Sequence, residues 1–212
     1  MKIKKIIYPK TIRIDNNNDI VITEKLDGSN LGIFKLNGVI HFAQRNNIIS
    51  YDGLDFKPTY GGLKGWADEH IEYLKEQLQE TSCLLGEWIG MGKLKYKDTD
   101  IDKRFYMFAK ANIDENYDLT NVLFNHNYFI YPFGTQVIPE FIGIVPTVCV
   151  RITQPSVENL DGLYDRYTEL KGRRVEGFVI ALNDRHILKY VRMKNGKLAP
   201  HKTETGIAKG DI

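Results

Sequence analysis

Cysteine is scarce in this chain of 212 residues, which contains only Cys83 and Cys149. Each lies in an apolar stretch, CLLGEW or VPTVCV, and neither has a second cysteine at the spacing of a metal-ligand pair. We therefore predict two buried, reduced thiols in a cytoplasmic protein. The same scarcity excludes a disulfide framework and a structural zinc site.

Long apolar runs are also missing, since none approaches the roughly 20 residues that a membrane-spanning helix needs. The N-terminal sequence MKIKKIIYPK is basic, but no apolar stretch of signal-peptide length follows it. We therefore expect a protein that has no membrane partner and no secretory leader.

An excess of charge of one sign is the third absence, because the formal net charge is only +2. A protein that binds nucleic acid needs a local basic surface rather than a basic average, so this value neither demands nor excludes such a partner. The C-terminal third is locally basic, with Lys171, Arg173, Arg174, Arg185, Lys189, Arg192, Lys194, Lys197 and Lys202. This run is either a solvated surface or a surface for nucleic acid.

Strand-like segments dominate what the chain does contain. Alternating and β-branched patterns predict strands over residues 21–26, 31–36, 39–45, 82–89, 104–112, 145–152, 175–182 and 186–193. Asn37-Gly38 predicts a hairpin with a type I′ turn, because both central residues of that turn need a positive φ. Residues 183–185 predict a second hairpin.

Helical spacing of apolar residues predicts helices over 61–81 and 155–170, the second with Pro155 in its first turn. A short helix is expected within 118–129. Strands and helices are mixed without strict alternation, which favours an α+β fold of antiparallel β-sheets flanked by helices. We see no repeat or linker and predict a single domain over 1–212, with a short irregular tail from about residue 195.

Lys25 lies where a predicted strand ends, in the sequence Glu24-Lys25-Leu26-Asp27-Gly28-Ser29-Asn30. Asp-Gly favours a tight turn, from which the lysine would project. Taken alone, such a segment is most often an ordinary surface turn.

Five further residues with chemical potential follow Lys25 in or beside apolar strands. They are Arg45 in FAQRNN, Glu87 in LLGEWIG, Phe108 in FYMFAKANI, Glu176 in VEGFVIAL and Lys189 in ILKYVR. A charge in such a place is costly unless it is paired or used. Any one of the four charged residues fits a salt-bridged strand edge, but the complete ordered set favours a functional site.

In this order the set resembles the covalent nucleotidyltransferase superfamily, which comprises RNA ligases, ATP-dependent DNA ligases and mRNA capping enzymes. Lys25, Asp27 and Gly28 are similar to its Lys-x-Asp-Gly nucleophile motif. With Glu24 and Asn30, the segment looks most like the RNA ligase branch related to the phage nick-sealing ligase. The later motifs are matched by Arg45, Gly86-Glu87, Phe108, Glu176-Gly177 and Lys189. The resemblance covers residues from about 20 to 195.

The resemblance implies the ATP-grasp-like nucleotidyltransferase domain of polynucleotide ligases, here without a separate OB-fold or helical C-terminal domain. It implies ATP as substrate and Mg²⁺ or Mn²⁺ as cofactor. The implied ATP site comprises Glu24, Lys25, Asn30, Arg45, Glu87, Phe108, Glu176 and Lys189. Four of these would be catalytic, namely Lys25, Lys189, Glu176 and Arg45, and Glu176 would also bind the metal.

Individual roles follow from the same resemblance and from the chemistry of each group. Lys25 would attack the α-phosphate of ATP as a neutral amine, which a nearby cation such as Lys189 would favour. Phe108 would stack on adenine, and Glu24 would accept a hydrogen bond from its amino group. Glu87 would contact the ribose. Lys189 would also neutralise charge on the phosphates, as would Arg45.

The implied activity is that of an RNA ligase serving RNA repair. Lys25 takes AMP from ATP, AMP passes to a 5′-phosphate RNA end, and a 3′-hydroxyl displaces AMP to join the strands. Two alternatives stay open, a minimal ATP-dependent DNA nick ligase and an adenylation-impaired nucleic-acid-binding module. A protein partner that supplies a missing domain is also possible.

Two positions depart from the family pattern. Ala109 follows Phe108 where an acidic residue is usual, and Val191 stands where the fifth motif usually has its second lysine. Arg192 is one residue further along, which in a strand directs its side chain to the opposite face. These departures favour the binding-module alternative.

Overall fold

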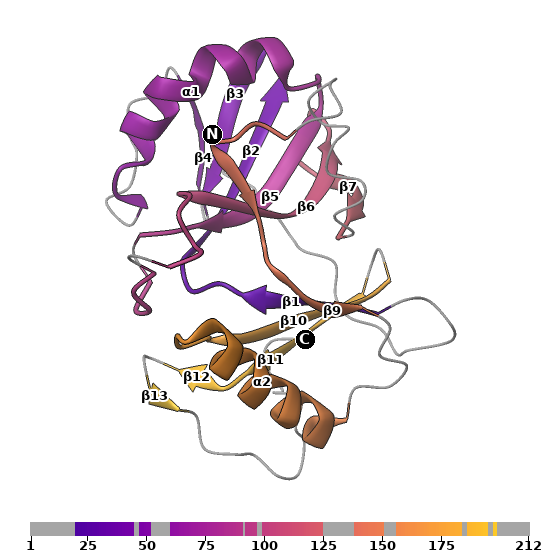
Figure 1. The fold of residues 1–212 in the computed structure, drawn as a ribbon. Helices are drawn as coiled ribbons and strands as arrows, with labels where there is room; N and C mark the ends of the chain where they lie inside the picture. The colour runs from indigo at the N-terminus through magenta and orange to yellow at the C-terminus, as the bar shows by residue number, and fades with distance from the viewer. Residues whose placement is uncertain are drawn as a thin grey trace. The chain divides into compact units, whose positions relative to one another are not determined.

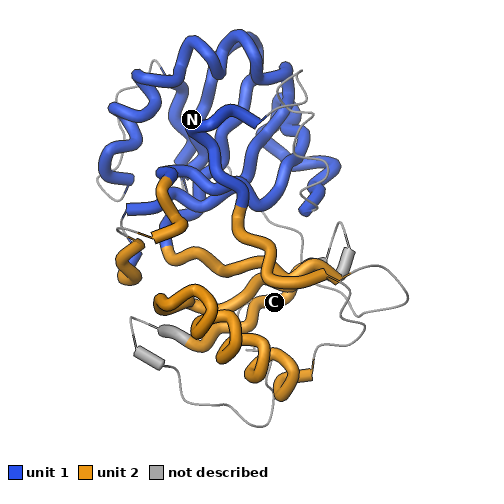
Figure 2. The backbone as a smooth tube through the Cα atoms, in the orientation of Figure 1, with its two compact units in different colours: residues 1–8, 28–92, 103–144 blue, residues 9–27, 93–102, 145–212 orange. Residues whose placement is uncertain are grey.

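The computed structural model describes residues 20–44, 47–51, 60–90, 92–96, 99–124, 138–150, 156–183, 186–194 and 197–198. They divide into two compact units (Figures 1 and 2). Unit 1 takes the described residues of 28–92 and 103–144, and unit 2 takes those of 9–27, 93–102 and 145–212. The chain passes between the units more than once, so no single cut would separate them. That residues 1–212 form one nucleotidyltransferase domain stays a prediction.

The described part of unit 1 is built on a sheet of seven strands. Six follow the order β4-β3-β2-β5-β6-β7 and pair antiparallel, while β8 pairs parallel with β6. The strands are β2 (Ser29–Leu36), β3 (Val39–Gln44), β4 (Asn47–Ser50), β5 (Ser82–Trp88), β6 (Phe105–Ile113), β7 (Leu119–Leu123) and β8 (Ile142–Ile144). Asn37 and Gly38, with φ of 53° and 74°, form the turn between β2 and β3, which confirms the predicted hairpin.

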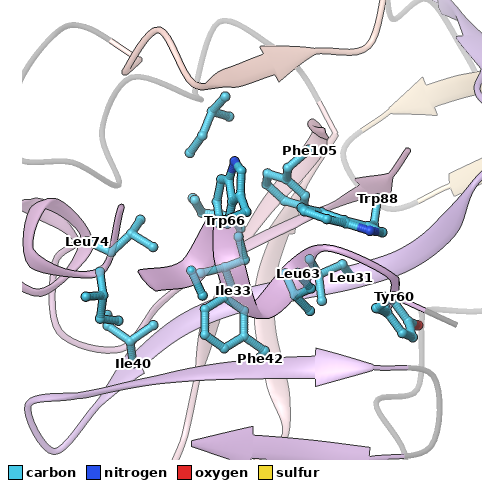
Figure 3. Close-up of a cluster of buried hydrophobic side chains, with 14 of the residues drawn as sticks. Leu31, Ile33, Ile40, Phe42, Tyr60, Leu63, Trp66, Leu74, Trp88 and Phe105 are labelled. Atoms are coloured by element: carbon cyan, nitrogen blue, oxygen red, sulfur yellow. The ribbon is translucent and has the colours of Figure 1, made fainter. Parts of the chain in front are cut away.

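Helix α1 (Leu63–Gln77) packs on one face of this sheet (Figure 1). Its buried residues recur at three- and four-residue spacing, so they form a single apolar stripe. That stripe meets alternate residues of the strands in one core (Figure 3), whose labelled members are Leu31, Ile33, Ile40, Phe42, Tyr60, Leu63, Trp66, Leu74, Trp88 and Phe105. The predicted helix over 61–81 is confirmed, with shorter bounds.

The short helix predicted within 118–129 is wrong for the part that the structure describes. Residues Leu119–Leu123 form strand β7, which pairs with the end of β6. Tyr117 and Asn121 have positive φ, which a regular helix does not accommodate. The open edge of β6 offers this segment backbone partners, and those outweigh its weak helical propensity.

Unit 2 has a four-stranded antiparallel sheet in the order β11-β10-β1-β9. Its strands are β1 (Val21–Lys25), β9 (Thr147–Val150), β10 (Gly177–Asn183) and β11 (His186–Val191). Two short strands, β12 (Met193–Lys194) and β13 (Lys197–Leu198), form a separate hairpin. The predicted pairing of the last two long strands is confirmed as β10 with β11.

Helix α2 (Val157–Lys171) packs on one face of the unit 2 sheet through Leu160, Tyr164 and Tyr167. Ser156 caps its N-terminus by accepting a hydrogen bond from the Asn159 amide. The helix therefore begins at Val157, two residues later than predicted, and Pro155 lies outside the described residues. Opposite the helix lie Ile22, Phe178, Ile180 and Tyr190, all buried.

These elements confirm the predicted α+β class with antiparallel sheets flanked by helices. Cys83 and Cys149 are both free. Cys83 is buried, but Cys149 is only partly covered because β9 is an edge strand. Among the described residues, no helix combines the length and the apolar character that a membrane crossing requires.

Candidate active site

Strand β1 presents consecutive side chains to opposite faces of the unit 2 sheet. Ile22 and Glu24 face α2, since Ile22 belongs to the core beneath that helix and Glu24 binds Tyr167 from it. By the two-residue period of a strand, Thr23 and Lys25 face away from α2. Lys25 ends β1, directly opposite Gly177 on β10.

Lys25 forms an ion pair with Glu176, the residue just before β10. Lys25 Nζ lies 2.5 Å from Glu176 Oε2, and the two side chains are 24% and 19% exposed. The pairing of β1 with β10 sets this contact, because it brings the end of one strand beside the start of the other. A primary amine and a carboxylate therefore share a partly desolvated place.

Burial raises the pKa of Glu176 above its ordinary value. The positive charges of Lys25 and Lys189 act in the opposite sense, and the carboxylate of Asp27 adds to the rise. Burial is the largest of these effects, so the ionised form of Glu176 is held at a cost. Perturbed carboxylates of this kind gather at functional sites.

Lys189 lies on β11, opposite Val179 of β10. Directly opposed residues share a face, and Val179 lies two residues from Gly177, so Lys189 is on the same face as Lys25. Its side chain is exposed and its charge acts on Glu176. The structure thus brings together three of the predicted residues, Lys25, Glu176 and Lys189.

Glu24 lies on the other face, in a buried ionic cluster. Arg173 donates from Nη1 to Glu24 Oε1 at 2.5 Å and from Nη2 to Oε2 at 2.8 Å. Tyr167 donates its hydroxyl to Oε2 at 2.9 Å. The Glu24 side chain is 0% exposed. The Glu24 carboxylate is thus enclosed by protein groups on the α2 side of the sheet, and its predicted contact with adenine stays a prediction.

Asp27 fastens the turn that follows Lys25. Its Oδ2 accepts hydrogen bonds from the backbone amides of Lys93 at 2.6 Å and Leu94 at 2.7 Å. Its own amide donates to the Tyr96 hydroxyl at 2.9 Å. The aspartate of the Lys-x-Asp-Gly motif is therefore a structural anchor in this chain.

Three predicted residues belong to unit 1. Asn30 on β2 lies directly opposite Glu87 on β5, so their side chains share one face of the sheet. Phe108 on β6 is partly exposed and stacks on Phe124, with ring centroids 6.5 Å apart and planes inclined by 10°. The remaining predicted residue, Arg45, lies outside the described residues.

Two motif glycines lie where a side chain has no room. A Cβ atom at Gly177 would stand 1.9 Å from the Tyr190 carbonyl oxygen, and its φ of 158° is one that other residues rarely adopt. A Cβ atom at Gly28 would stand 2.3 Å from the Trp88 carbonyl oxygen. Glycine follows Asp27 and Glu176 because the neighbouring backbone approaches closely at both places.

Gly177→Ala is expected to lower the free energy of unfolding by about 3 kcal/mol, because it adds both a steric clash and backbone strain. Urea denaturation of the purified variant measures the change. Gly162→Ala in α2 is the matched control, since its Cβ would meet nothing closer than 3.8 Å. Equal stability of the two variants would contradict the steric explanation.

The two departures from the family pattern have different surroundings. Ala109 is fully buried opposite Leu85, where a carboxylate would be desolvated. Val191 lies opposite Gly177, on the face of Lys25. Arg192 donates to Asp161 of α2 at 2.9 Å, which confirms that it projects to the other face. Arg192 therefore does not replace the second lysine of the motif.

A divalent cation would find oxygen donors here, but no complete set of protein ligands. No group of three or more His, Cys, Asp and Glu side chains is arranged for a metal within the described ranges. Mg²⁺ commonly binds through one or two carboxylates together with substrate phosphates and water. Glu176 fits that mode, since it is a partly exposed carboxylate beside the candidate nucleophile.

Sequence reasoning missed Arg173, Tyr96 and Tyr167, which hold the residues on either side of Lys25. In the sequence, Arg173 is one member of the basic C-terminal run. No local signal marks any of the three, because their partners lie far away in the sequence; Arg173 and Glu24 are separated by 149 positions.

Comparison with solved structures supports the fold. An archaeal ATP-dependent RNA ligase (form 1) is similar, with a TM-score of 0.50 and 17% identity, over 82% of this chain and 43% of that chain. A Naegleria gruberi RNA ligase mutant, solved with ATP and Mn, has a TM-score of 0.52 and 17% identity, over 82% of this chain and 49% of that chain. The chain thus spans less than half the length of either structure.

Comparison with sequences gives a sharper result. No curated protein matches the chain. The family model for RNA ligase matches residues 18–191, a range that includes every candidate site residue from Glu24 to Lys189. Since this match extends over most of its length, the chain belongs to the RNA ligase family.

Proposed function

We propose that this chain is an ATP-dependent RNA ligase that carries AMP on Lys25. The observation that carries the proposal is the contact of Lys25 Nζ with Glu176 Oε2 at 2.5 Å, with Lys189 on the same face of the sheet. An amine, a carboxylate with a raised pKa and a second cation form the set that lysine adenylation needs. Membership of the RNA ligase family supports this assignment.

In the first step, Lys25 Nζ attacks the α-phosphorus of ATP. A bond forms between nitrogen and phosphorus, the bond to the bridging oxygen breaks, and pyrophosphate leaves. Nζ must lose a proton to attack, and Glu176 Oε2 lies within hydrogen-bond distance to take it. Lys189 offsets negative charge that develops on the phosphate oxygens.

A divalent cation would supply charge neutralisation at the phosphates of ATP. We assign Glu176 as the residue that holds it, because this carboxylate is partly exposed next to Lys25. The Naegleria gruberi neighbour was solved with ATP and Mn, which supports the use of a nucleotide and a divalent metal by this chain. Mg²⁺ and Mn²⁺ are both candidates.

The remaining steps would move AMP from Lys25 to a 5′-phosphate end of RNA and then join that end to a 3′-hydroxyl. Asn30, Arg45, Glu87 and Phe108 are assigned to ATP binding. A protein partner that supplies further RNA-binding surface is also part of the proposal. RNA repair in the cytoplasm is the corresponding role.

Incubation of the purified chain with α-labelled ATP and Mg²⁺ or Mn²⁺ tests the proposal directly. We expect label on the protein that survives denaturing electrophoresis, is released by acid and is discharged by added pyrophosphate. A chain that takes up no label across both metals and from pH 6 to 9 would refute lysine adenylation.

The polynucleotide is tested separately with pre-adenylated protein. We expect loss of label from the protein and joined product with nicked RNA or single-stranded RNA that carries a 5′-phosphate. Joining of nicked DNA at an equal or higher rate would favour the DNA nick ligase, which is the alternative from the same reaction class.

Val191→Lys tests the alternative of an adenylation-impaired binding module. Position 191 lies opposite Gly177 on the face of Lys25, so a lysine there adds positive charge beside the phosphates. We expect the rate of lysyl-AMP formation to rise by about tenfold. A binding module that lacks only this charge would instead show label in the variant and none in the wild type.

A further inference from the structure

Arg173 occupies the centre of an ionic cluster on the α2 side of the unit 2 sheet, in which Glu24 is buried and Asp100 is exposed. The Arg173 side chain is 7% exposed. The two terminal nitrogens bind the two oxygens of Glu24, and Nε donates to Asp100 Oδ1 at 2.9 Å. A lysine has one nitrogen and could not reproduce this three-point arrangement, so the guanidinium is specifically required.

The cluster holds the residue immediately before the nucleophile. Both oxygens of Glu24 receive hydrogen bonds from Arg173, and Oε2 also receives one from Tyr167. Charge-assisted bidentate bonds of this type fix both the position and the orientation of a carboxylate. The backbone of Glu24 is bound as well, because its amide donates to the Pro146 carbonyl at 2.8 Å.

The same cluster reaches the residue two positions after the nucleophile. The Arg173 guanidinium lies over the Tyr96 ring, 5.3 Å from its centroid. The Tyr96 hydroxyl accepts a hydrogen bond from the amide of Asp27, and the Asp27 carboxylate caps the amides of Lys93 and Leu94. Tyr96 is buried, so the contact between its ring and Arg173 is largely shielded from water.

We propose that Arg173 is a positioning residue for Lys25, which it fixes from both sides through Glu24 and through Tyr96 and Asp27. Strand alternation allows this, because Glu24 points to the cluster while Lys25 points to the opposite face. The inference rests on the proposed function, since it concerns the geometry with which Lys25 meets the α-phosphate. Nucleophilic attack in line with the leaving group is sensitive to displacements of about 1 Å.

Three variants separate positioning from mere folding. Arg173→Met removes the guanidinium and keeps an apolar chain of similar length. Arg173→Lys keeps the positive charge but removes the guanidinium nitrogens that bind Glu24 and Asp100 together. Arg174→Met is the matched control, because Arg174 is the next residue and is exposed. The rate of lysyl-AMP formation in a single turnover and the KM for ATP are measured for each, per mole of folded protein.

We expect Arg173→Met to lower the single-turnover rate at saturating ATP by about 100-fold, with KM for ATP changed less than about threefold. Arg173→Lys recovers part of the rate, and Arg174→Met stays within about twofold of the wild type. The double variant with Glu24→Gln removes the unpaired buried carboxylate, so it regains stability but stays as slow as Arg173→Met. A double variant with wild-type rate would overturn the inference.

A second measurement needs no ATP. Trace acetylation followed by peptide mass spectrometry gives the reactivity of Lys25 relative to Lys95, which is exposed in the same unit. Release of Lys25 from its fixed place in Arg173→Met is expected to change this ratio at least about threefold. An unchanged ratio together with an unchanged rate refutes the positioning role. A changed ratio in a chain that forms no lysyl-AMP refutes the proposed function and leaves the positional inference supported.

Discussion

Lys25→Ala is expected to eliminate covalent labelling by ATP, lowering the yield of protein-bound AMP by at least about 1000-fold. No other described lysine combines the features of this position, namely the end of a central strand and a carboxylate at 2.5 Å. The Lys25 amine itself becomes bonded to phosphorus, so no neighbouring group can take its place once it is removed. Quantitative autoradiography against wild-type protein at equal folded concentration measures the loss.

Lys95→Ala is the matched control for this result. Lys95 is exposed in the same unit, so its removal is expected to leave labelling within about twofold of wild type. Lys25→Ala itself is expected to change the free energy of unfolding by no more than about 1 kcal/mol, because a partly exposed ion pair contributes little. Retention of label in Lys25→Ala would transfer the nucleophile to another residue and refute the site.

The grouping of Lys25, Glu176 and Lys189 could be predicted from the order of residue types along the chain. Lys25, Glu176 and Lys189 are far apart in sequence, yet each stands at a recognisable place beside an apolar strand. Antiparallel pairing of β1, β10 and β11 then brings them to one face. The motif residues carry information on strand pairing because the strands that form the sheet also carry the candidate site residues.

The partners of these residues could not be predicted in the same way. Nothing near Glu24 indicates that Arg173 and Tyr167 will enclose it, since both come from the end of α2 and the turn after it. Asp27 likewise caps two amides from a loop 66 and 67 positions away. Contacts of this kind depend on how loops close, and loop closure leaves no periodic pattern in the sequence.

The error at β7 has a related cause. The segment from Asp118 onward has mixed propensity and a possible capping residue, which favours a short helix when it is considered alone. Pairing with β6 decides the outcome, because β7 aligns with the sheet edge at Lys110, Asn112 and Ile113. Local propensity is a weak guide where a long strand offers an unpaired edge.

Strand alternation explains how this small sheet serves both stability and chemistry. Glu24 and Tyr190 face α2 and bind Arg173 and Asp161 there. Their sequence neighbours Lys25 and Lys189 face the other way. Each of these lysines is therefore next to an anchored residue. The contacts on the α2 face can orient the opposite face without any of them lying among the candidate site residues.

Glu176→Gln is expected to lower lysyl-AMP formation by at least about 100-fold while leaving the fold intact. The amide cannot take a proton from Lys25 Nζ and is a poorer ligand for a divalent cation than a carboxylate. Single-turnover labelling with Mg²⁺ and with Mn²⁺ measures the rate. Glu169→Gln, on the exposed surface of α2, is the matched control and should label at the wild-type rate.

Glu176→Gln is expected to slow the reaction but to stabilise the fold, and the pH dependence of the unfolding free energy shows the sign of this second effect. Burial raises the pKa of Glu176 in the folded protein. A group of this kind stabilises the fold below its unfolded pKa, and that contribution is lost as pH rises through the folded pKa. Glutamine resembles the protonated form at every pH, so it does not incur this loss.

The wild type should therefore lose stability relative to Glu176→Gln as pH rises from about 4 through the raised folded pKa of Glu176. The difference in unfolding free energy between the two proteins should then level off near neutrality. Urea denaturation at closely spaced pH values gives this curve, with Glu169→Gln giving a flat one. A difference that instead grows in favour of the wild type would mean that Lys25 and Lys189 depress the pKa of Glu176 more than burial raises it. An active site that is held at a cost to stability should show the first pattern, because its ionised carboxylate is retained for chemistry rather than for folding.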